Sequence, residues 1–347
     1  MTTLSPPQTQ INSVIALYSN GQIQEALNAV ETLIKDYPNE PVLYNISGAC
    51  YANLGQLDTA VKTYKKTLTI KPNYAEAHNN LGFTFQELGQ LDEAVKCFEQ
   101  ALAINPNYAE AHNNLGNTLK ELNQLDAAVK IYKKALAIKP DYSDAYYNLG
   151  GTLKDLGQLD AAVKFYKQAL AINPDNSDAH NNLGVVFQEL NQLDAAVKSF
   201  EKAIAIKLDY VDAHYNLGNA LKKLSRLDAA VKSYEKTLTI KPDYAEVHNN
   251  LGLALMELGQ PEASIRSFEK ALAIKPDFAQ AYQNYGNTFY NFMRFDEALT
   301  SFERALVLNP ELNFLLGISL HTKMHLCIWD DLPNRLNELT KKINNNE

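Results

Sequence analysis

Five regularly spaced histidines could take part in catalysis or metal binding, because imidazole binds metals and transfers protons near neutral pH. They share one position of a 34-residue interval: His78, His112, His180, His214 and His248. Zinc needs its ligands within about 2.0–2.3 Å, and each of these histidines falls on a separate expected helix. Tyrosine takes the same position at Tyr44, Tyr146 and Tyr282. We therefore interpret the histidines as packing residues.

A second histidine pair, His321 and His325, lies four residues apart on an expected helix with the sequence HTKMH. The glutamate of an HExxH zinc site is missing, and two ligands do not make a site. The sequence also lacks the GxxxxGK[ST], GxGxxG and GxSxG motifs of nucleotide binding and serine hydrolysis. We predict no catalytic residue, no metal and no cofactor in this chain.

Asparagine forms the most regular polar row. It occupies one position in seven successive intervals: Asn80, Asn114, Asn148, Asn182, Asn216, Asn250 and Asn284. In four of the seven, another asparagine precedes it: Asn79, Asn113, Asn181 and Asn249. Each side chain offers one acceptor and two donors on a short stem, so it can accept from the N–H and donate to the C=O of a peptide group. The row therefore predicts a site that holds an extended polypeptide by its backbone.

Composition excludes several classes of partner. The 347 residues carry a net charge of −8 with acids and bases mixed, which disfavours a nucleic-acid partner. The three cysteines, Cys50, Cys97 and Cys327, are odd in number and lack CxxC spacing, so neither a disulfide framework nor a zinc site is expected. The polar N-terminus lacks the pattern of a signal peptide, and no apolar run is long enough to cross a membrane. The expected location is the cytoplasm.

The elements that position these residues repeat with the same 34-residue period, and nine units fill residues 7–312 without insertion or deletion. Within the third unit, His78, Leu81 and Phe85 lie at helical spacing. A second helical stripe begins at Leu91, after a Gly-Gln turn, and Pro106 ends it. Each unit is therefore predicted to be a helix, a tight turn and a second helix. We predict a disordered segment at 1–6, nine repeats at 7–312 and a helical extension at 313–347.

The pattern LG…F…A…F…A…P within each unit resembles the tetratricopeptide repeat (TPR). This resemblance implies an all-α fold, a right-handed superhelical solenoid of antiparallel helix pairs. It places the first helices, and with them the asparagine row, on the concave face. One asparagine per repeat would then meet about every third residue of a threaded chain, because helices lie about 8–10 Å apart and an extended chain advances about 3.3 Å per residue. The alternative is that each asparagine bonds to the neighbouring repeat.

Small residues recur in register and predict close helix contacts. Glycine costs roughly 1 kcal/mol against alanine in the middle of a helix, yet it recurs at Gly48, Gly82, Gly116, Gly150, Gly184, Gly218, Gly252 and Gly286. We expect the same packing role for Ala60, Ala94, Ala128, Ala162, Ala196 and Ala230. Leu208 replaces the proline at one repeat boundary, where we expect a less sharply ended helix. Val14 stands at the glycine position of the first unit, and we expect this atypical unit to cap the N-terminal end of the array.

Two sets of charges follow the same period. Second helices carry an acid with a base four residues on, a spacing that favours ion pairs on a solvated convex face: Asp58/Lys62, Asp92/Lys96, Asp126/Lys130, Asp160/Lys164, Asp194/Lys198, Asp228/Lys232 and Glu262/Arg266. First helices carry an acid beside the asparagine row: Glu76, Glu110, Asp144, Asp178, Asp212 and Glu246. The second set either favours basic or serine- and threonine-rich clients or serves the helix dipole.

The tail beyond residue 312 stays apolar where the end of a solenoid normally carries a polar cap. Its sequence, HTKMHLCIWDDL…RLNELTKKI, resembles the segment that follows the repeats in SPINDLY-like protein O-GlcNAc transferases of glycosyltransferase family 41. That resemblance implies a catalytic domain docking on 313–347, and transfer from UDP-GlcNAc to serine or threonine only if that domain follows. We expect an exposed apolar stripe formed by Phe314, Leu316, Leu320, Leu336 and Ile343.

Three functions follow from these observations. The first is a protein–protein interaction scaffold that binds extended client polypeptides in its concave groove. The second is the substrate-recruiting portion of a protein O-GlcNAc transferase. The third is a helical-repeat RNA binder, but such proteins vary their base-contacting side chains in a basic groove, and a uniform asparagine row in an acidic chain argues against it.

Overall fold

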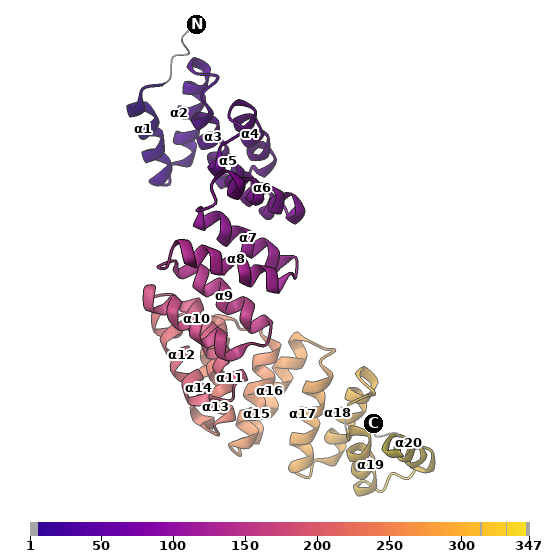
Figure 1. Cartoon of the computed structure of the whole chain (residues 1–347). Helices are drawn as coiled ribbons and strands as arrows, with labels where there is room; N and C mark the ends of the chain where they lie inside the picture. Colours follow the sequence, from indigo (N-terminus) through magenta and orange to yellow (C-terminus); the bar gives the residue numbers. More distant parts are fainter. Residues whose placement is uncertain (1–5, 313, 331, 345–347) are drawn as a thin grey trace. The chain divides into compact units, whose positions relative to one another are not determined.

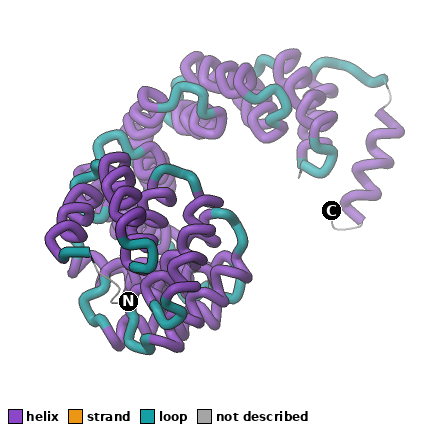
Figure 2. Tube along the Cα trace, turned by 90° about the horizontal axis from the view of Figure 1, so that it is seen from above, coloured by secondary structure: helices purple, strands orange, loops and turns teal. Residues whose placement is uncertain are grey.

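The computed structural model describes residues 6–312, 314–330 and 332–344, with the side chains of 332, 338 and 341–344 left out. Throughout this part of the chain the secondary structure is helix joined by short loops, without strand, as Figure 2 shows. The all-α prediction is therefore confirmed. The segment expected to be disordered, 1–6, falls mostly on residues 1–5, which lie outside the description.

The chain divides into two compact units, Met1–Pro174 and Asp175–Glu347, each described here by itself. The described residues of the first unit, 6–174, form these helices, labelled in Figure 1: α1 (Gln8–Ser19), α2 (Ile23–Asp36), α3 (Pro41–Asn53), α4 (Leu57–Ile70), α5 (Ala75–Glu87), α6 (Leu91–Ile104), α7 (Ala109–Glu121), α8 (Leu125–Ile138), α9 (Ser143–Asp155) and α10 (Leu159–Ile172).

The second unit continues the same pattern and adds two helices beyond it. Its helices are α11 (Ser177–Glu189), α12 (Leu193–Ile206), α13 (Val211–Lys223), α14 (Leu227–Ile240), α15 (Ala245–Glu257), α16 (Pro261–Ile274), α17 (Ala279–Asn291), α18 (Phe295–Leu308), α19 (Leu315–His325) and α20 (Leu332–Asn344). Pro261 is the first residue of α16, where the missing N–H leaves no hydrogen bond unmade.

Each odd-numbered helix from α1 to α17 packs against the even-numbered helix that follows it, and each pair packs against the next pair within its unit. Successive odd-numbered helices also contact one another, whereas no comparable contact joins successive even-numbered helices in the described residues. The odd-numbered helices therefore lie closer together, and each unit curves toward them. We call the surface that the odd-numbered helices form the groove face.

The helix pairs are held together by an aromatic ring that rests on a glycine. A Cβ added to Gly116 would lie 2.5 Å from Cε1 of Tyr132, a fully buried ring on the second helix of the same repeat. The same contact recurs at Gly48, Gly82, Gly150, Gly184, Gly218, Gly252 and Gly286, with predicted Cβ distances of 2.5–3.1 Å. The six alanines expected to pack between helices are all fully buried. The prediction of close helix contact is confirmed.

Helix ends do not depend on the proline that usually follows them. The second helix α12 ends at Ile206, two residues before Leu208, just as α10 ends at Ile172, two residues before Pro174. The expectation of a less sharply ended helix at Leu208 was wrong. The loop after α12 is held as in the repeats with proline, because the Leu208 carbonyl accepts from His214 Nε2 (3.0 Å), and any residue supplies that carbonyl.

The charged pairs expected on the second helices do not form. None of the seven acid–base pairs at four-residue spacing approaches within 4 Å in the described part of the chain, and Lys96 instead contacts Glu93 (2.8 Å). Arg226 bonds Asp194 of the preceding repeat (2.8 Å). Exposed ion pairs contribute only about 0–1 kcal/mol, so the sequence spacing alone does not hold these side chains together.

Candidate functional site: the groove face

The seven asparagines of the predicted site all lie on odd-numbered helices, α5 to α17, and therefore on the groove face. Six are half-buried and Asn284 is buried. The asparagines that precede them in the sequence, Asn79, Asn113, Asn181 and Asn249, are all buried, as is Asn45 at the corresponding position of α3. We call the half-buried set together with Asn284 the outer row and the buried set the inner row.

In the first unit, each outer asparagine donates a hydrogen bond to an inner asparagine of the preceding repeat. The Nδ2–Oδ1 pairs are Asn80–Asn45 (3.3 Å), Asn114–Asn79 (3.1 Å) and Asn148–Asn113 (3.0 Å). Asn45 in turn donates to the carboxylate of Glu76 (3.0 Å). The asparagines therefore do link neighbouring repeats, which is the alternative that the sequence left open.

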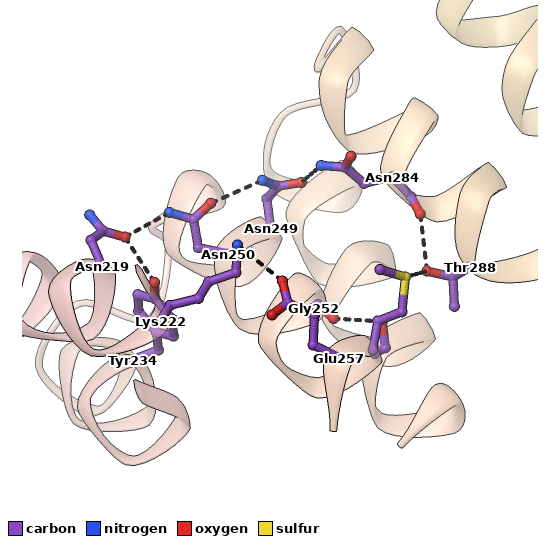
Figure 3. A network of polar contacts seen from close by, with 11 residues as sticks. Asn219, Lys222, Tyr234, Asn249, Asn250, Gly252, Glu257, Asn284 and Thr288 are labelled. Carbon is purple, nitrogen blue, oxygen red and sulfur yellow. Dashed lines mark hydrogen bonds and ion pairs between the residues drawn. The ribbon is translucent and has the colours of Figure 1, made fainter. Parts of the chain in front are cut away.

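The second unit repeats this arrangement, and Figure 3 shows part of it. Asn284 donates to Asn249 (2.9 Å), and Asn249 donates to Asn250 (3.2 Å). Asn250 then donates to Asn219 (3.1 Å), which also accepts from the hydroxyl of Tyr234 (2.8 Å). Amide groups on three successive odd-numbered helices, α13, α15 and α17, thus form one continuous chain of hydrogen bonds.

In the first unit, the inter-repeat bonds use only part of the hydrogen-bonding capacity of the outer row. An asparagine has two donor hydrogens and an acceptor oxygen. In Asn80, Asn114 and Asn148 the bond to the inner row uses one donor, and no bond to Oδ1 is found within the described residues. Each amide is thus fixed in orientation and still has an acceptor and a donor for a ligand on the groove face.

The acidic row beside the asparagines lies at the groove edge and is mostly exposed. Three of its members have contacts within the protein: Glu76 accepts from Asn45, Asp178 accepts from the Tyr210 hydroxyl (2.7 Å), and Glu246 pairs with Lys275 (3.3 Å). All six occupy the first turn of a helix, where a carboxylate also interacts favourably with the helix dipole. The contacts differ from repeat to repeat, so these acids form no single structural motif.

A third row, which the sequence reasoning missed, crosses the groove face near the ends of the odd-numbered helices. It joins a residue of one repeat to an acid 35 positions later: Gln86 to Glu121, Lys120 to Asp155 (3.0 Å) and Lys222 to Glu257 (3.4 Å). For the two lysines, the sequence carries this signal as a base-to-acid spacing of 35 residues. That spacing joins neighbouring repeats, so the four-residue spacing expected within one helix does not reveal it.

The recurring histidines bind a loop rather than a metal. In four repeats the ring Nε2 lies 2.9–3.0 Å from the carbonyl oxygen six residues earlier, and these residues are His78, His112, His214 and His248. Tyr44, at the same position, donates its hydroxyl to the carbonyl of Pro38 (3.0 Å). A carbonyl only accepts, so Nε2 must carry the proton. Histidine and tyrosine can both occupy this position, as His78 and Tyr44 show, because both can donate at this reach.

Burial disfavours the charged form of two of these histidines. The Nδ1 atoms of His112 and His248 are buried and have no hydrogen-bond partner. Burial is the main cause that lowers the pKa of each ring, and the neighbouring Lys134 and Lys270 lower it further. The prediction that these histidines only pack was therefore incomplete, since each ring also holds the loop before its helix by a hydrogen bond.

The first unit contains a hollow of about 510 Å³ on the groove face between α1, α3 and α5. Its apolar walls include Ile15, Val42, Ile46, Ala49 and Phe83. We call it the N-terminal pocket. Sequence reasoning did not single out these residues, although Val42 and Ile46 stand where later repeats carry the acid and the outer asparagine.

The tail covers the last repeat instead of presenting an apolar stripe. Leu315 is fully buried against Phe289, Phe302 and Ala305, so α19 closes the hydrophobic core of the last repeat. Leu316 and Leu320 are buried as well, which contradicts the expectation that they are exposed. Phe314 and Leu336 are exposed, and the side chain of Ile343 lies outside the described residues. The expected exposed stripe does not form because the apolar face of α19 packs against α18.

The second histidine pair takes part in an aromatic cluster with the last repeat. The Tyr290 hydroxyl lies 2.6 Å from Nδ1 of His321, and the ring of His325 stacks on Phe295 with centroids 4.4 Å apart. No group of three or more histidine, cysteine, aspartate or glutamate side chains within the described residues is placed to hold a metal ion. No helix in the described ranges is both long and apolar enough to cross a membrane.

Comparisons with known proteins agree with the repeat. Sequence profiles described as tetratricopeptide repeat match residues 73–141, 131–164, 245–278 and 279–312. One described as TPR repeat matches 48–89, 150–191, 188–225 and 218–259. The matches run without a gap from residue 48 to residue 312. No curated protein matches the chain.

Solved structures resemble the chain in fold. A chain of the APC/C hetero-tetramer Cut9–Hcn1 has a TM-score of 0.55 at 19% identity, over 80% of this chain and 55% of that one. PilF of Pseudomonas aeruginosa has a TM-score of 0.54 at 20% identity, over 61% and 96%. YrrB, described as a TPR protein with an unusual peptide-binding site, has a TM-score of 0.49 at 25% identity, over 54% and 96%.

These comparisons do not support the resemblance of the tail to O-GlcNAc transferases. They do agree with the helix pairs, the glycine–ring contacts and the 34-residue period described above. Proteins built from such repeats typically mediate protein–protein interaction. The chain belongs to the tetratricopeptide repeat family.

Proposed function

We propose that this protein is an interaction scaffold whose groove face binds extended segments of client polypeptides through the outer row of asparagines: Asn80, Asn114, Asn148, Asn182, Asn216, Asn250 and Asn284. The observation that carries the proposal is the fixed orientation of these amides. In Asn80, Asn114 and Asn148, the bond to the preceding repeat holds each side chain in place, and an acceptor and a donor remain for a ligand.

Fixed amides favour binding for a thermodynamic reason. A flexible side chain loses about 0.5–1.5 kcal/mol of conformational entropy when a ligand immobilises it, and here the protein has already immobilised it. A ligand that pairs its backbone N–H and C=O with such amides also needs no particular side chain. The proposed groove therefore accepts many sequences, which suits a scaffold.

The partner in this proposal is a protein and not a nucleic acid. The exposed carboxylates of Glu110, Asp144 and Asp212 along the groove edge repel phosphate groups. A glycosyltransferase domain docked on 313–347 is not part of the proposal, because Leu316 and Leu320, two of the residues expected to hold it, are buried.

The inner row supplies a matched control for testing the proposal. Replacing Asn114 and Asn148 by alanine removes two inter-repeat bonds together with two groove amides. A second double variant with alanine at Asn79 and Asn113 removes the same two bonds and leaves the groove amides in place. Both variants should lose stability, by about 0.5–1.5 kcal/mol for each bond.

Peptide binding separates the two variants. We expect the outer-row variant to bind a panel of unrelated fluorescein-labelled twelve-residue peptides at least tenfold more weakly than the wild type. The inner-row variant should bind more tightly than the outer-row variant because its groove amides remain. It should bind more weakly than the wild type because a ligand must immobilise each freed amide, at about 0.5–1.5 kcal/mol per side chain. Fluorescence anisotropy well below the melting temperature measures both. Equal losses in the two variants would show that the asparagines serve only to stack the repeats.

A further inference from the structure

The second repeat, residues 41–74, departs from both polar rows of the groove face. Val42 occupies the position of the acidic row, and Ile46 occupies the position of the outer asparagines. From α5 to α15, every odd-numbered helix carries an acid and an asparagine at these two positions. At α3 the groove face is therefore apolar where the later repeats present carboxylates and amides.

The apolar side chains of this repeat form the floor of the N-terminal pocket. Ile46 and Val42 are half-buried there, and α1 and α5 add Ile15 and Phe83, which are 43% and 47% exposed. Large apolar side chains gathered around a hollow of about 510 Å³ match the size and lining of ligand sites. The hollow is concave and open to the groove, so a ligand side chain can enter it.

The charged residues that line the N-terminal pocket are both acidic, among neutral polar residues such as Asn53 and Thr84. Glu76 and Glu87 line it, and no lysine or arginine does. Neither carboxylate forms an ion pair in the described part of the chain, although Asn45 donates one hydrogen bond to Glu76 (3.0 Å). The two acids lie on the same helix, about 16 Å apart along its axis at 1.5 Å per residue, with Phe83 between them. The apolar floor is therefore bounded by negative charge on both sides.

We propose that the N-terminal pocket binds a bulky apolar side chain of an extended client, with a lysine or arginine next to it in the client sequence. The apolar side chain contacts Ile46 and Phe83, and the base lies against Glu76 or Glu87. This inference rests on the proposed function, since it assigns one side-chain-specific subsite to a groove that otherwise contacts the backbone.

Residues 1–7, which precede α1, do not match this ligand. The segment ahead of α1 contains no lysine or arginine, and the first basic residue of the chain is Lys35, on α2. Charge complementarity therefore favours a separate basic and apolar peptide. A second copy of the chain is the remaining competitor, and the experiment below distinguishes it.

The test compares peptides that differ at one residue. The probe is fluorescein-labelled Ser-Gly-Ser-Phe-Lys-Ser-Gly-Ser, with versions carrying alanine for phenylalanine or glutamine for lysine. We expect the first peptide to bind the wild type at least tenfold more tightly than the alanine version. We also expect it to bind about threefold more tightly than the glutamine version at low salt, because a solvent-exposed ion pair contributes little.

The first variant introduces residues that a neighbouring repeat already carries at the same positions. Val42→Glu with Ile46→Asn gives the second repeat the residues that the third carries at Glu76 and Asn80, so the fold is expected to tolerate them. This double variant should bind the phenylalanine and alanine peptides equally. Ile172→Asn, an exposed apolar residue outside the pocket, is the control and should keep the tenfold preference. Glu87→Gln should reduce the preference for lysine, and circular dichroism checks that each variant is folded.

Four results would overturn the inference. Equal binding of the phenylalanine and alanine peptides to the wild type would exclude a side-chain pocket while leaving backbone binding intact. A preference that survives in the double variant would place the selective site elsewhere. No measurable binding of any peptide would remove the proposed function as well. Dimerisation of the wild type that the double variant abolishes, measured by analytical ultracentrifugation, would identify a second copy as the occupant.

Discussion

Replacing Gly116 by alanine is expected to destabilise the protein, although alanine is the better helix former. Gly116 lies in the middle of α7, and an added Cβ would lie 2.5 Å from Cε1 and 2.7 Å from Cδ1 of Tyr132. The Tyr132 ring is fully buried, and its hydroxyl donates to Oδ1 of Asn117 (2.7 Å). The ring therefore cannot move away without loosening α7 from α8 or breaking that hydrogen bond.

The magnitude follows from two opposing effects. Overpacking of a core by one methyl group costs about 1–3 kcal/mol, and replacing glycine by alanine within a helix gains about 1 kcal/mol. The difference is a net destabilisation of up to about 2 kcal/mol, and we expect the upper end for Gly116→Ala because its contact of 2.5 Å is among the shortest. Gly150 is the matched control, because its added Cβ would lie no closer than 3.1 Å to Tyr166. There the two effects nearly cancel, and a change close to zero is expected.

Urea unfolding followed by circular dichroism measures both variants. Hydrogen exchange of amides in α7 and α8 adds a local measure, which is useful because repeat arrays do not always unfold in one step. In a Tyr132→Leu background the obstructing ring is absent, so Gly116→Ala should there be neutral or stabilising. If Gly116→Ala stabilises the otherwise unchanged protein as much as helix propensity predicts, the ring contact does not explain the glycine.

Three further predictions follow from the geometry. Burial lowers the pKa of His112 and His248, so these residues take up a proton in the unfolded chain at a higher pH than in the folded protein. The free energy of unfolding should therefore fall as the pH drops below about 6.5, by at most about 1.4 kcal/mol per pH unit for each ring. Tyrosine at both positions, which keeps the donor as at Tyr44, should flatten this dependence in unfolding measured from pH 7.5 to 5. Met293 has a φ of 58°, and Met293→Gly should stabilise the protein by about 0.5–1 kcal/mol in the same measurement. Deleting 313–347 should lower the melting temperature, because α19 covers the core of the last repeat, and an unchanged melting temperature would contradict that role.

The fold could be predicted from the sequence because each structural requirement recurs in register. A single mid-helix glycine such as Gly116 is ambiguous, but the same glycine at 34-residue intervals indicates a contact that every repeat makes. Regular spacing was less informative for charges. Asp92 and Lys96 have the spacing of an ion pair, yet Lys96 bonds Glu93 instead, because exposed side chains exchange partners at little free-energy cost.

The sequence predicted which helix face carries the candidate site, but it did not predict the hydrogen bonds of its side chains. The period placed Asn80 and Asn114 on the same face, but a sequence does not say whether an amide points to a ligand or to the next repeat. The tail failed for a related reason. An apolar residue such as Leu320 looks like an exposed surface only if nothing packs on it, and α18 supplied a covering surface that the sequence could not place.

The two roles considered for the outer asparagines are compatible, and one repeat helps to separate them. In α13 the inner position is Tyr215 instead of asparagine, so the usual Nδ2–Oδ1 pair is not available there. The outer residue that faces it is still Asn250, which donates to the Tyr215 hydroxyl (3.2 Å) and to Asn219 (3.1 Å). Asn250 also accepts from Asn249 (3.2 Å), and both of its donor hydrogens are used within the protein. Stacking therefore accounts for the amide at this repeat. The peptide-binding role rests instead on repeats such as those of Asn114 and Asn148, where one bond to the inner row fixes the amide and leaves an acceptor and a donor for a ligand.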